Sequence, residues 1–311
     1  MDTYAPVALF VYNRPVHASR TLEALKVNEG ASDTDLYIFA DGPKPDASEK
    51  DVAAIRETRA VISSVKGFRN VFLKVSEKNI GLEKSIVSGI NEVLEKNSSI
   101  IVLEDDIVTA EFFLSFCNQG LKKYNDDEHV AAISGYMFPV ASRAGSAFFL
   151  PIISCWGWAT WKRSWKKYDG NAGHLLQVIQ QNNAESRFDL NNSYPYLDML
   201  KMRAAGKINS WAVCWYASVF NRRGLMLYPP VSLVDNVGMD GSGTNFVKKS
   251  SHHALKITSL SAGKFMLPDL VEENKTMQKK VEKFLRAIHY PTITGRIVSK
   301  LRRSIKKFSV K

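Results

Sequence analysis

The amino-acid sequence predicts an α/β fold built around a mostly parallel sheet. Strand and helix patterns alternate four times over the first 107 residues, which is typical of a parallel sheet covered by helices on both faces. The fourth strand, Ile-Ile-Val-Leu at 100–103, is apolar throughout, as in a strand buried on both faces. It ends in three consecutive carboxylates, Glu104, Asp105 and Asp106. Because open α/β sheets bind ligands at the carboxyl ends of their strands, these carboxylates are the first candidate for a functional site.

The other elements follow in short steps along the chain. Each strand pattern is an apolar run closed by turn residues, such as Asp41-Gly42-Pro43 after the second strand. Each helix pattern repeats apolar residues every three or four positions. The predicted elements are strands over 7–12, 35–40, 70–75 and 100–103, and helices over 17–27, 48–65 and 81–96.

The usual glycine-rich phosphate loops are missing after the first strand. Asn13-Arg14-Pro15 stands at that place instead. A phosphate bound without a glycine cradle needs a metal ion or side-chain cations, and the acidic cluster and Arg14 are suited to supply these. A run of carboxylates is often only a solvated turn. The buried strand in front of this one favours a binding site.

Four motifs together resemble a known family. They are Val-Ala-Leu-Phe-Val-Tyr-Asn-Arg-Pro at 7–15, Phe-Ala-Asp-Gly at 39–42, Asn-Ile-Gly-Leu at 79–82 and Leu-Glu-Asp-Asp at 103–106. The set resembles the GT-A fold nucleotide-sugar glycosyltransferases, and more closely a bacterial, family 2-like branch similar to N-acetylglucosaminyltransferase I. The resemblance covers roughly residues 5–247 and continues through the motifs at 157–161, 210–211, 227–229 and 241–244.

The resemblance implies a role for each matching residue. Arg14 and Asp41 would contact the nucleotide, Glu104 and Asp105 would lie against the ribose and the sugar, and Asp106 would bind Mn²⁺ or Mg²⁺ directly. The metal would neutralise the leaving nucleoside diphosphate while a carboxylate base takes the acceptor's proton, with inversion at the anomeric carbon. Simpler roles stay open for two residues. Arg14 could pair with a nearby carboxylate, and Asp41 could serve its own turn.

The catalytic base departs from the family pattern. In the related eukaryotic enzyme an Asp follows a Trp, whereas here Ala212 follows Trp211. Asp240 is the first choice for the base, because glycines on both sides would let its loop close over a substrate. Asp198 and Asp169 are the alternatives, and an ordinary turn residue is the competing interpretation of Asp240.

A tryptophan-rich segment spans residues 155–165. Trp158, Trp161 and Trp165 would share one face of a helix, so we predict that they pack in the core. Trp156 stands at the start of the segment. We predict that its ring lines the acceptor site, since an aromatic face suits the apolar face of a sugar.

The positive charge is confined to the C-terminal end. The chain has 42 Lys and Arg against 31 Asp and Glu, and residues 275–311 hold twelve of the basic residues with one acid, Glu282, so that residues 1–274 are neutral overall. A nucleic-acid enzyme would carry the excess over its groove, so no nucleic acid is expected as a partner. The pattern over 293–308, apolar on one face and basic on the other, predicts a helix resting on an anionic membrane surface. Docking on the protein itself or on a partner is the alternative.

The remaining patterns bear on location and organisation. No apolar run approaches the roughly 20 residues of a spanning helix, and no signal-peptide pattern begins the chain. The three cysteines are too scattered for a disulfide framework. We therefore expect a cytoplasmic protein, peripheral on the inner face of the plasma membrane. Residues 1–107 would bind the donor, 108–270 the acceptor, and 271–311 would form a basic helical tail.

These observations predict an inverting, metal-dependent glycosyltransferase. It would transfer a sugar from a nucleotide donor, with UDP expected, to a glycan or lipid-linked glycan, as in lipopolysaccharide or capsule synthesis. One alternative is a sugar-nucleotide nucleotidyltransferase, which would however need a glycine-rich basic loop after the first strand. Another is a non-catalytic nucleotide-sugar or glycan-binding subunit, which Ala212 keeps open. The sequence gives no indication of the oligomeric state.

Overall fold

The computed structural model describes residues 4–140, 145–240 and 265–290. Within them, the central sheet has eight strands, and two further strands form a small separate sheet. The eight strands, in the order in which they lie side by side, are β3 (Asn70–Val75), β2 (Asp35–Ala40), β1 (Val7–Val11), β4 (Ser99–Glu104), β8 (Trp158–Trp161), β6 (Val130–Ser134), β9 (Leu225–Tyr228) and β7 (Phe148–Leu150).

The sheet is mostly parallel, as predicted. β3, β2, β1 and β4 are parallel neighbours, β8 lies antiparallel between β4 and β6, and β7 closes the far edge antiparallel to β9. The structure thus confirms an α/β class with a central, mostly parallel sheet and flanking helices.

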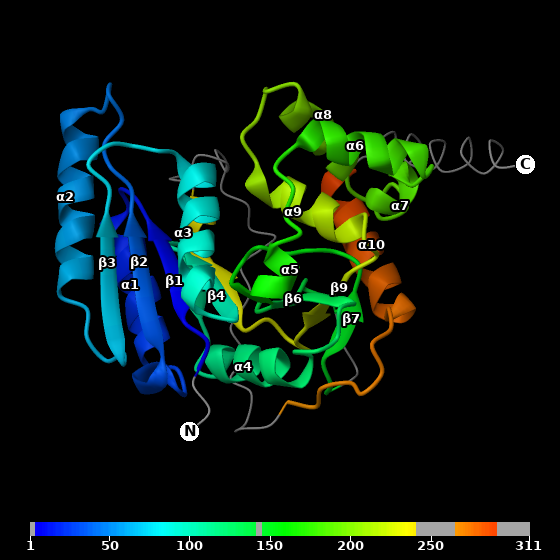
Figure 1. Cartoon of the computed structure of the whole chain (residues 1–311), viewed down its shortest axis with the longest axis horizontal. Coiled ribbons are helices and arrows are strands. Elements are labelled where there is room, and N and C mark those ends of the chain that lie inside the picture. The colour runs from blue at the N-terminus through cyan, green and yellow to red at the C-terminus, as the bar shows by residue number, and fades with distance from the viewer. Residues whose placement is uncertain (1–3, 141–144, 241–264, 291–311) are drawn as a thin grey trace, which may run out of the picture.

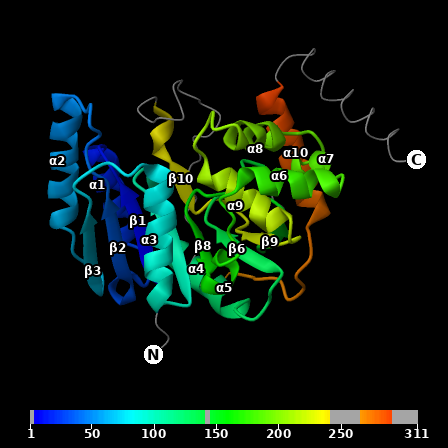
Figure 2. The same cartoon turned by 45° about the horizontal axis from the view of Figure 1, so that its top comes forward.

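Helices flank the sheet, and the later ones, α6 to α10, are grouped at one end of it. They are α1 (Pro15–Lys26), α2 (Glu49–Ser63), α3 (Leu82–Lys96), α4 (Phe113–Lys123), α5 (Lys162–Trp165), α6 (Ala172–Gln181), α7 (Glu185–Phe188), α8 (Tyr196–Ala204), α9 (Trp211–Phe220) and α10 (Lys275–His289), with short 3₁₀ turns η1 (Ala31–Asp33) and η2 (Val237–Asp240). In Figures 1 and 2 the strands β3, β2 and β1 lie at the left, and helices α6 to α10 are grouped at the right.

β4 occupies the middle of the sheet because its apolar run is covered on both faces. Residues 100–103 are at most 1% exposed. α3 lies close to the sheet at Gly89, where an added Cβ would come within 2.6 Å of the Phe10 ring. The Phe10 ring itself stacks on Phe39 of β2, with centroids 5.0 Å apart. The carboxyl end of β4 is therefore held in a fixed place.

The small sheet brings a distant segment back to this end of β4. β5 (Ile107–Thr109) follows the carboxylates directly and pairs antiparallel with β10 (Val234–Asn236). Asn236 lies opposite Ile107, so the chain leaves β10 beside Asp106. This pairing places the η2 turn next to the carboxylate cluster.

The tryptophan segment forms different elements from the helix that its spacing predicts. Trp158 and Trp161 lie in β8, and Trp165 lies in α5. The helical prediction was wrong because β8 pairs with both β4 and β6, and this pairing outweighs the helical spacing. The predicted burial is confirmed, since the three side chains are at most 4% exposed.

The start of the predicted basic tail packs against the rest of the protein. α10 buries Met277, Val281 and Leu285. Its one acid, Glu282, is buried and accepts a hydrogen bond from Asn191 at 2.7 Å. The segment 293–308, predicted as an interfacial helix, lies outside the described residues. Within the described ranges, each helix is too short or too polar to cross a bilayer.

Candidate functional site

The three carboxylates stand at the turn between β4 and β5. Glu104 ends β4, and Asp105 and Asp106 form the turn itself. The hydroxyl of Thr21 in α1 donates to the backbone carbonyl of Asp105 at 2.8 Å. The amide of Val237 in η2 donates to the carbonyl of Asp106 at 2.9 Å. The cluster is thus held from two sides by segments that are far apart in sequence.

Arg14 faces two of these carboxylates. It caps the start of α1, and its Nη2 and Nε both contact the Asp105 carboxylate, Nε at 3.4 Å from Oδ2. Its Nη1 lies 2.9 Å from Oδ2 of Asp106. Burial alone lowers the pKa of Arg14, but the charges of Asp105 and Asp106 outweigh it and raise that pKa above its usual value. The pairing left open by the sequence is present, and it joins Arg14 to the predicted metal-binding turn.

Glu104 and Asp105 hold their protons more tightly than free carboxyl groups do, because their pKa values are raised. Burial raises the pKa of Glu104 to about 8, and the charges of Asp106 and Asp105 add to this effect. Burial also raises the pKa of Asp105 to about 6, although the charge of Arg14 opposes the rise. One guanidinium therefore does not offset three adjacent carboxylates, of which Asp105 is buried and the other two are partly exposed.

Asp41 organises the loop before α3. The carboxylate is buried, and it accepts hydrogen bonds from the amides of Gly42, Ile80 and Gly81 at 2.8 to 3.0 Å. Gly81 has a φ of +84°, a left-handed conformation that favours glycine. The bond from Gly42 is the turn contact that the sequence left open for Asp41, and the bonds from Ile80 and Gly81 tie a second segment to it. A contact with a nucleotide stays a prediction.

Asp240 contacts His17, a residue near the cluster that the sequence did not single out. Its Oδ2 lies 3.2 Å from Nε2 of His17, in the first turn of α1. The Asp240 side chain is 44% exposed. His17 lies three residues after Arg14, and this helical spacing was the signal that could have identified it.

Gly238 closes the cluster from the side of η2. A Cβ at this position would lie 2.1 Å from Oδ2 of Asp106 and 3.0 Å from Nη1 of Arg14. The backbone of η2 therefore lies directly against the carboxylate and the guanidinium, and any side chain would displace one of them.

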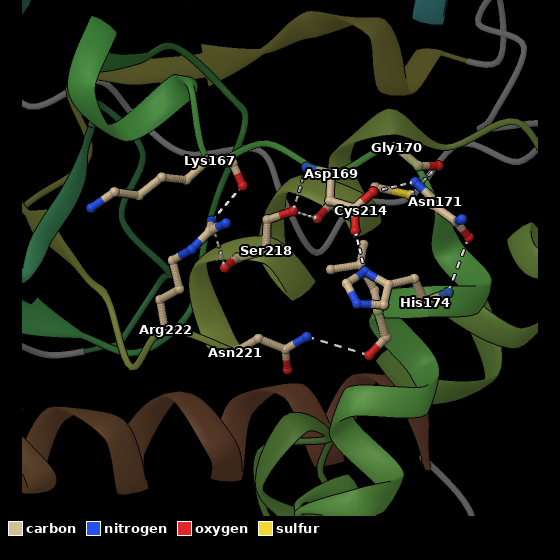
Figure 3. A network of polar contacts seen from close by, with 10 residues as sticks. Lys167, Asp169, Gly170, Asn171, His174, Cys214, Ser218, Asn221 and Arg222 are labelled. Carbon is tan, nitrogen blue, oxygen red and sulfur yellow. Dashed lines mark hydrogen bonds and ion pairs between the residues drawn. The ribbon is translucent and has the colours of Figure 1, made fainter.

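The two alternative bases have local contacts elsewhere in the chain. Asp198 is exposed on α8, with Lys201 3.9 Å away. Asp169 accepts a hydrogen bond from the amide of Asn171 at 2.7 Å, and its other oxygen lies 2.6 Å from Nδ1 of His174 (Figure 3). Both contacts of Asp169 belong to the start of α6. That Asp198 or Asp169 acts as the base stays a prediction.

Trp156 lies at the same edge of the sheet as the carboxylates. β8 runs antiparallel to β4, so the residues before Trp158 lie beside the end of β4. Burial raises the pKa of the neighbouring Cys155 thiol, and the charge of Glu104 adds to this rise. Trp156 is half-buried, with its ring edge-on to Tyr136 and centroids 4.7 Å apart. The ring of Trp156 is thus supported by the buried ring of Tyr136.

The donor atoms suit a hard divalent cation that brings other ligands with it. Among the described residues, no group of three or more His, Cys, Asp or Glu side chains is arranged to hold a metal ion. Asp106 lies at the turn with its side chain 15% exposed, and its Oδ2 contacts Nη1 of Arg14. Mg²⁺ is usually bound through one or two carboxylates together with substrate phosphates. The site fits that arrangement.

Comparison with known proteins leaves the family open. No protein-family model and no curated protein matches the chain. One matching solved structure is an active-site mutant of LgtC, at 8% identity and a TM-score of 0.41, over 71% of this chain and 72% of that one. Another is GalNAc-T7 with UDP, GalNAc and Mn²⁺, at 9% identity and a TM-score of 0.46, over 75% of this chain and 44% of GalNAc-T7. Both TM-scores lie below 0.5, and the family is not assigned from them.

Cation binding at the cluster should strengthen as the pH rises. Below the raised pKa values of about 6 for Asp105 and about 8 for Glu104, a cation must displace protons. We expect the Mn²⁺ affinity to increase by about tenfold or more from about pH 5.5 to about pH 8.5. Calorimetric titration measures it. Glu104→Gln should remove the part of the increase above neutral pH, and an affinity that falls with pH would contradict this account.

Substitution of Gly238 should disturb the cluster directly. In Gly238→Ala the new Cβ would overlap the Asp106 carboxylate, so this carboxylate or η2 must move. We expect Mn²⁺ binding to weaken by about tenfold with little change in the thermal unfolding temperature. Gly145→Ala is the matched control, because nothing lies within 4 Å of a Cβ at that glycine. Equal cation affinities in the two variants would show that η2 does not constrain Asp106.

Proposed function

We propose that the protein is an inverting, metal-dependent glycosyltransferase of the GT-A type, which transfers a hexose from a UDP-linked donor. The observation that carries this proposal is the pairing of Arg14 with Asp105 and Asp106 at the carboxyl end of β4. It places one cationic and several anionic groups where a parallel sheet binds its ligand. No glycine-rich phosphate loop follows β1, so a diphosphate needs such charged groups.

The donor half of the reaction belongs to residues 1–107 in this proposal. Asp106 binds the divalent cation, and Arg14 donates hydrogen bonds to the diphosphate. When bound, the cation offsets the charge that develops on the leaving nucleoside diphosphate. Asp41 ties the segment before α3, at Ile80 and Gly81, to the end of β2, where the nucleoside would lie. Glu104 and Asp105 lie toward the ribose and the sugar.

The acceptor half belongs to residues 108–270. The half-buried ring of Trp156, which packs edge-on against the buried ring of Tyr136, would meet the apolar face of a sugar. Asp240 removes the proton from the attacking hydroxyl, and His17 orients its carboxylate. Ala212 lies in the first turn of α9 and has no acidic group, so the base must come from another segment. In this proposal Asp240, at the end of η2, supplies it.

Two other functions remain as competitors. A sugar-nucleotide nucleotidyltransferase would also join a nucleotide-binding sheet to acidic ligands, but the segment after β1 is Tyr12-Asn13-Arg14-Pro15 rather than a glycine-rich loop. A non-catalytic nucleotide-sugar or glycan-binding subunit would use the same donor site without a base. The exposure of Asp240 beside the cluster favours the transferase.

Donor hydrolysis and point variants distinguish these functions. With Mn²⁺ and a panel of UDP-sugars, we expect slow hydrolysis of one donor and a rise in thermal stability on UDP binding. Asp106→Asn should abolish both, whereas Asp240→Asn should keep UDP binding and lower turnover by roughly 10²- to 10⁴-fold. A binding subunit would show no hydrolysis in any form. The proposal fails if no UDP-sugar is hydrolysed and none raises the thermal stability.

We further propose that the protein acts at the cytoplasmic face of the plasma membrane on a lipid-linked glycan, in the synthesis of lipopolysaccharide or capsule. Three exposed lysines, Lys275, Lys279 and Lys283, recur every four residues along α10. The acid of this helix, Glu282, is buried away from them. This face and the basic residues over 291–311 would attract anionic lipid.

Vesicle binding checks the membrane proposal. Replacing Lys275, Lys279 and Lys283 by Gln should weaken binding to phosphatidylglycerol vesicles by roughly a hundredfold, since each lysine near the surface contributes about 1 kcal/mol. The matched control replaces three exposed lysines elsewhere, Lys50, Lys66 and Lys96, and should bind as the unaltered protein does. Equal losses in both triple variants, or binding that does not depend on anionic lipid, would refute the proposal.

A further inference from the structure

We infer that Arg14 makes the site take up its cation and its nucleotide diphosphate together. The guanidinium contacts the carboxylate of Asp106 and competes with a cation for it, and a diphosphate that draws Nη1 away removes this competition. This inference rests on the proposed function and adds the coupling between the two ligands that fill that same site. Arg14 is thus a positioning residue whose Nη1 exchanges Asp106 for a phosphate oxygen.

The contacts of Arg14 with its two carboxylates are unequal. Asp105 receives both Nη2 and Nε and is 3% exposed, so this pair is fixed inside the protein. Asp106 receives only Nη1, and its side chain is 15% exposed. The contact with Asp106 is therefore the one that a ligand can replace. The guanidinium can turn Nη1 toward a phosphate oxygen while its other side stays on Asp105.

The space around this contact leaves little room for a cation beside the guanidinium. Nη1 and Oδ2 of Asp106 are 2.9 Å apart, and a Cβ at Gly238 would lie within 3.0 Å of both atoms. Val237 is tied to the carbonyl of Asp106, and Asp240 is tied to His17 in α1, so η2 is fixed at two points. A cation at Asp106 would thus meet a positive group confined on the same oxygen.

Charge explains why the two ligands would load together. A cation alone would be repelled by Arg14, and a diphosphate alone would face Asp105 and Asp106. When both arrive, the diphosphate takes over Nη1 and the cation takes over Asp106, so each charge gains a partner of opposite sign. Each ligand therefore raises the affinity for the other, and this coupling is reciprocal.

The test measures Mn²⁺ binding with and without saturating UDP, by electron paramagnetic resonance or calorimetry. For the unaltered protein we expect UDP to raise the Mn²⁺ affinity by about tenfold or more. Arg14→Met removes the guanidinium and should raise the affinity for Mn²⁺ alone by about tenfold, while the gain from UDP largely disappears. Arg20→Met removes an exposed charge from the same helix and should behave as the unaltered protein.

A second variant keeps the test valid if Arg14→Met does not fold with Asp105 unpaired. Arg14→Lys retains a charge for Asp105, but one ammonium cannot reproduce the planar fork. It should bind Mn²⁺ alone more tightly than the unaltered protein, by a smaller factor than Arg14→Met.

The outcomes separate the inference from the function on which it rests. If UDP and Mn²⁺ bind cooperatively to the unaltered protein but neither Arg14 variant binds Mn²⁺ alone more tightly, the inference is overturned and the donor site stands. If UDP does not bind the unaltered protein with or without Mn²⁺, the proposed function fails. Tighter Mn²⁺ binding in the Arg14 variants, with the UDP gain reduced, supports the inference.

Discussion

The site depends on the cost of placing several carboxylates at the end of a buried strand. Burial raises the pKa values of Glu104 and Asp105, which shows that their charged forms lack sufficient solvation. Arg14 offsets only part of the negative charge, and it must be held by α1 to do so. In the proposed function, the remaining negative charge is what attracts a cation, and a diphosphate with it, to the turn after β4.

The fold supplies the geometry that this charge balance needs. The parallel pairing of β1 with β2 and β4 sets the ends of three strands side by side, and with them Arg14, Asp41 and the carboxylates. The pairing of β5 with β10 returns the chain across more than a hundred residues to cover Asp106 with Gly238. Loss of either pairing would leave the charged groups present but apart.

The acceptor side is less closely built than the donor side. Trp156 lies at the same edge of the sheet as the carboxylates because β8 is inserted antiparallel between β4 and β6, and its ring packs on the buried Tyr136 that follows β6. His17 contacts Asp240, the proposed base, and lies in the first turn of α1. Arg14, whose guanidinium faces the carboxylates, stands at the start of the same helix. One helix thus connects the two halves of the proposed reaction.

Local sequence determined the first four strands, the helices between them and the acidic turn, because apolar period and turn residues are properties of neighbouring positions. It did not determine that Trp158 and Trp161 lie in a strand, since β8 owes its form to its two partners. Nor did it reveal His17, Gly238 or the unequal sharing of Arg14 between Asp105 and Asp106. Those contacts join segments far apart in the chain, and only tertiary packing decides which distant charges meet and how far each is removed from water.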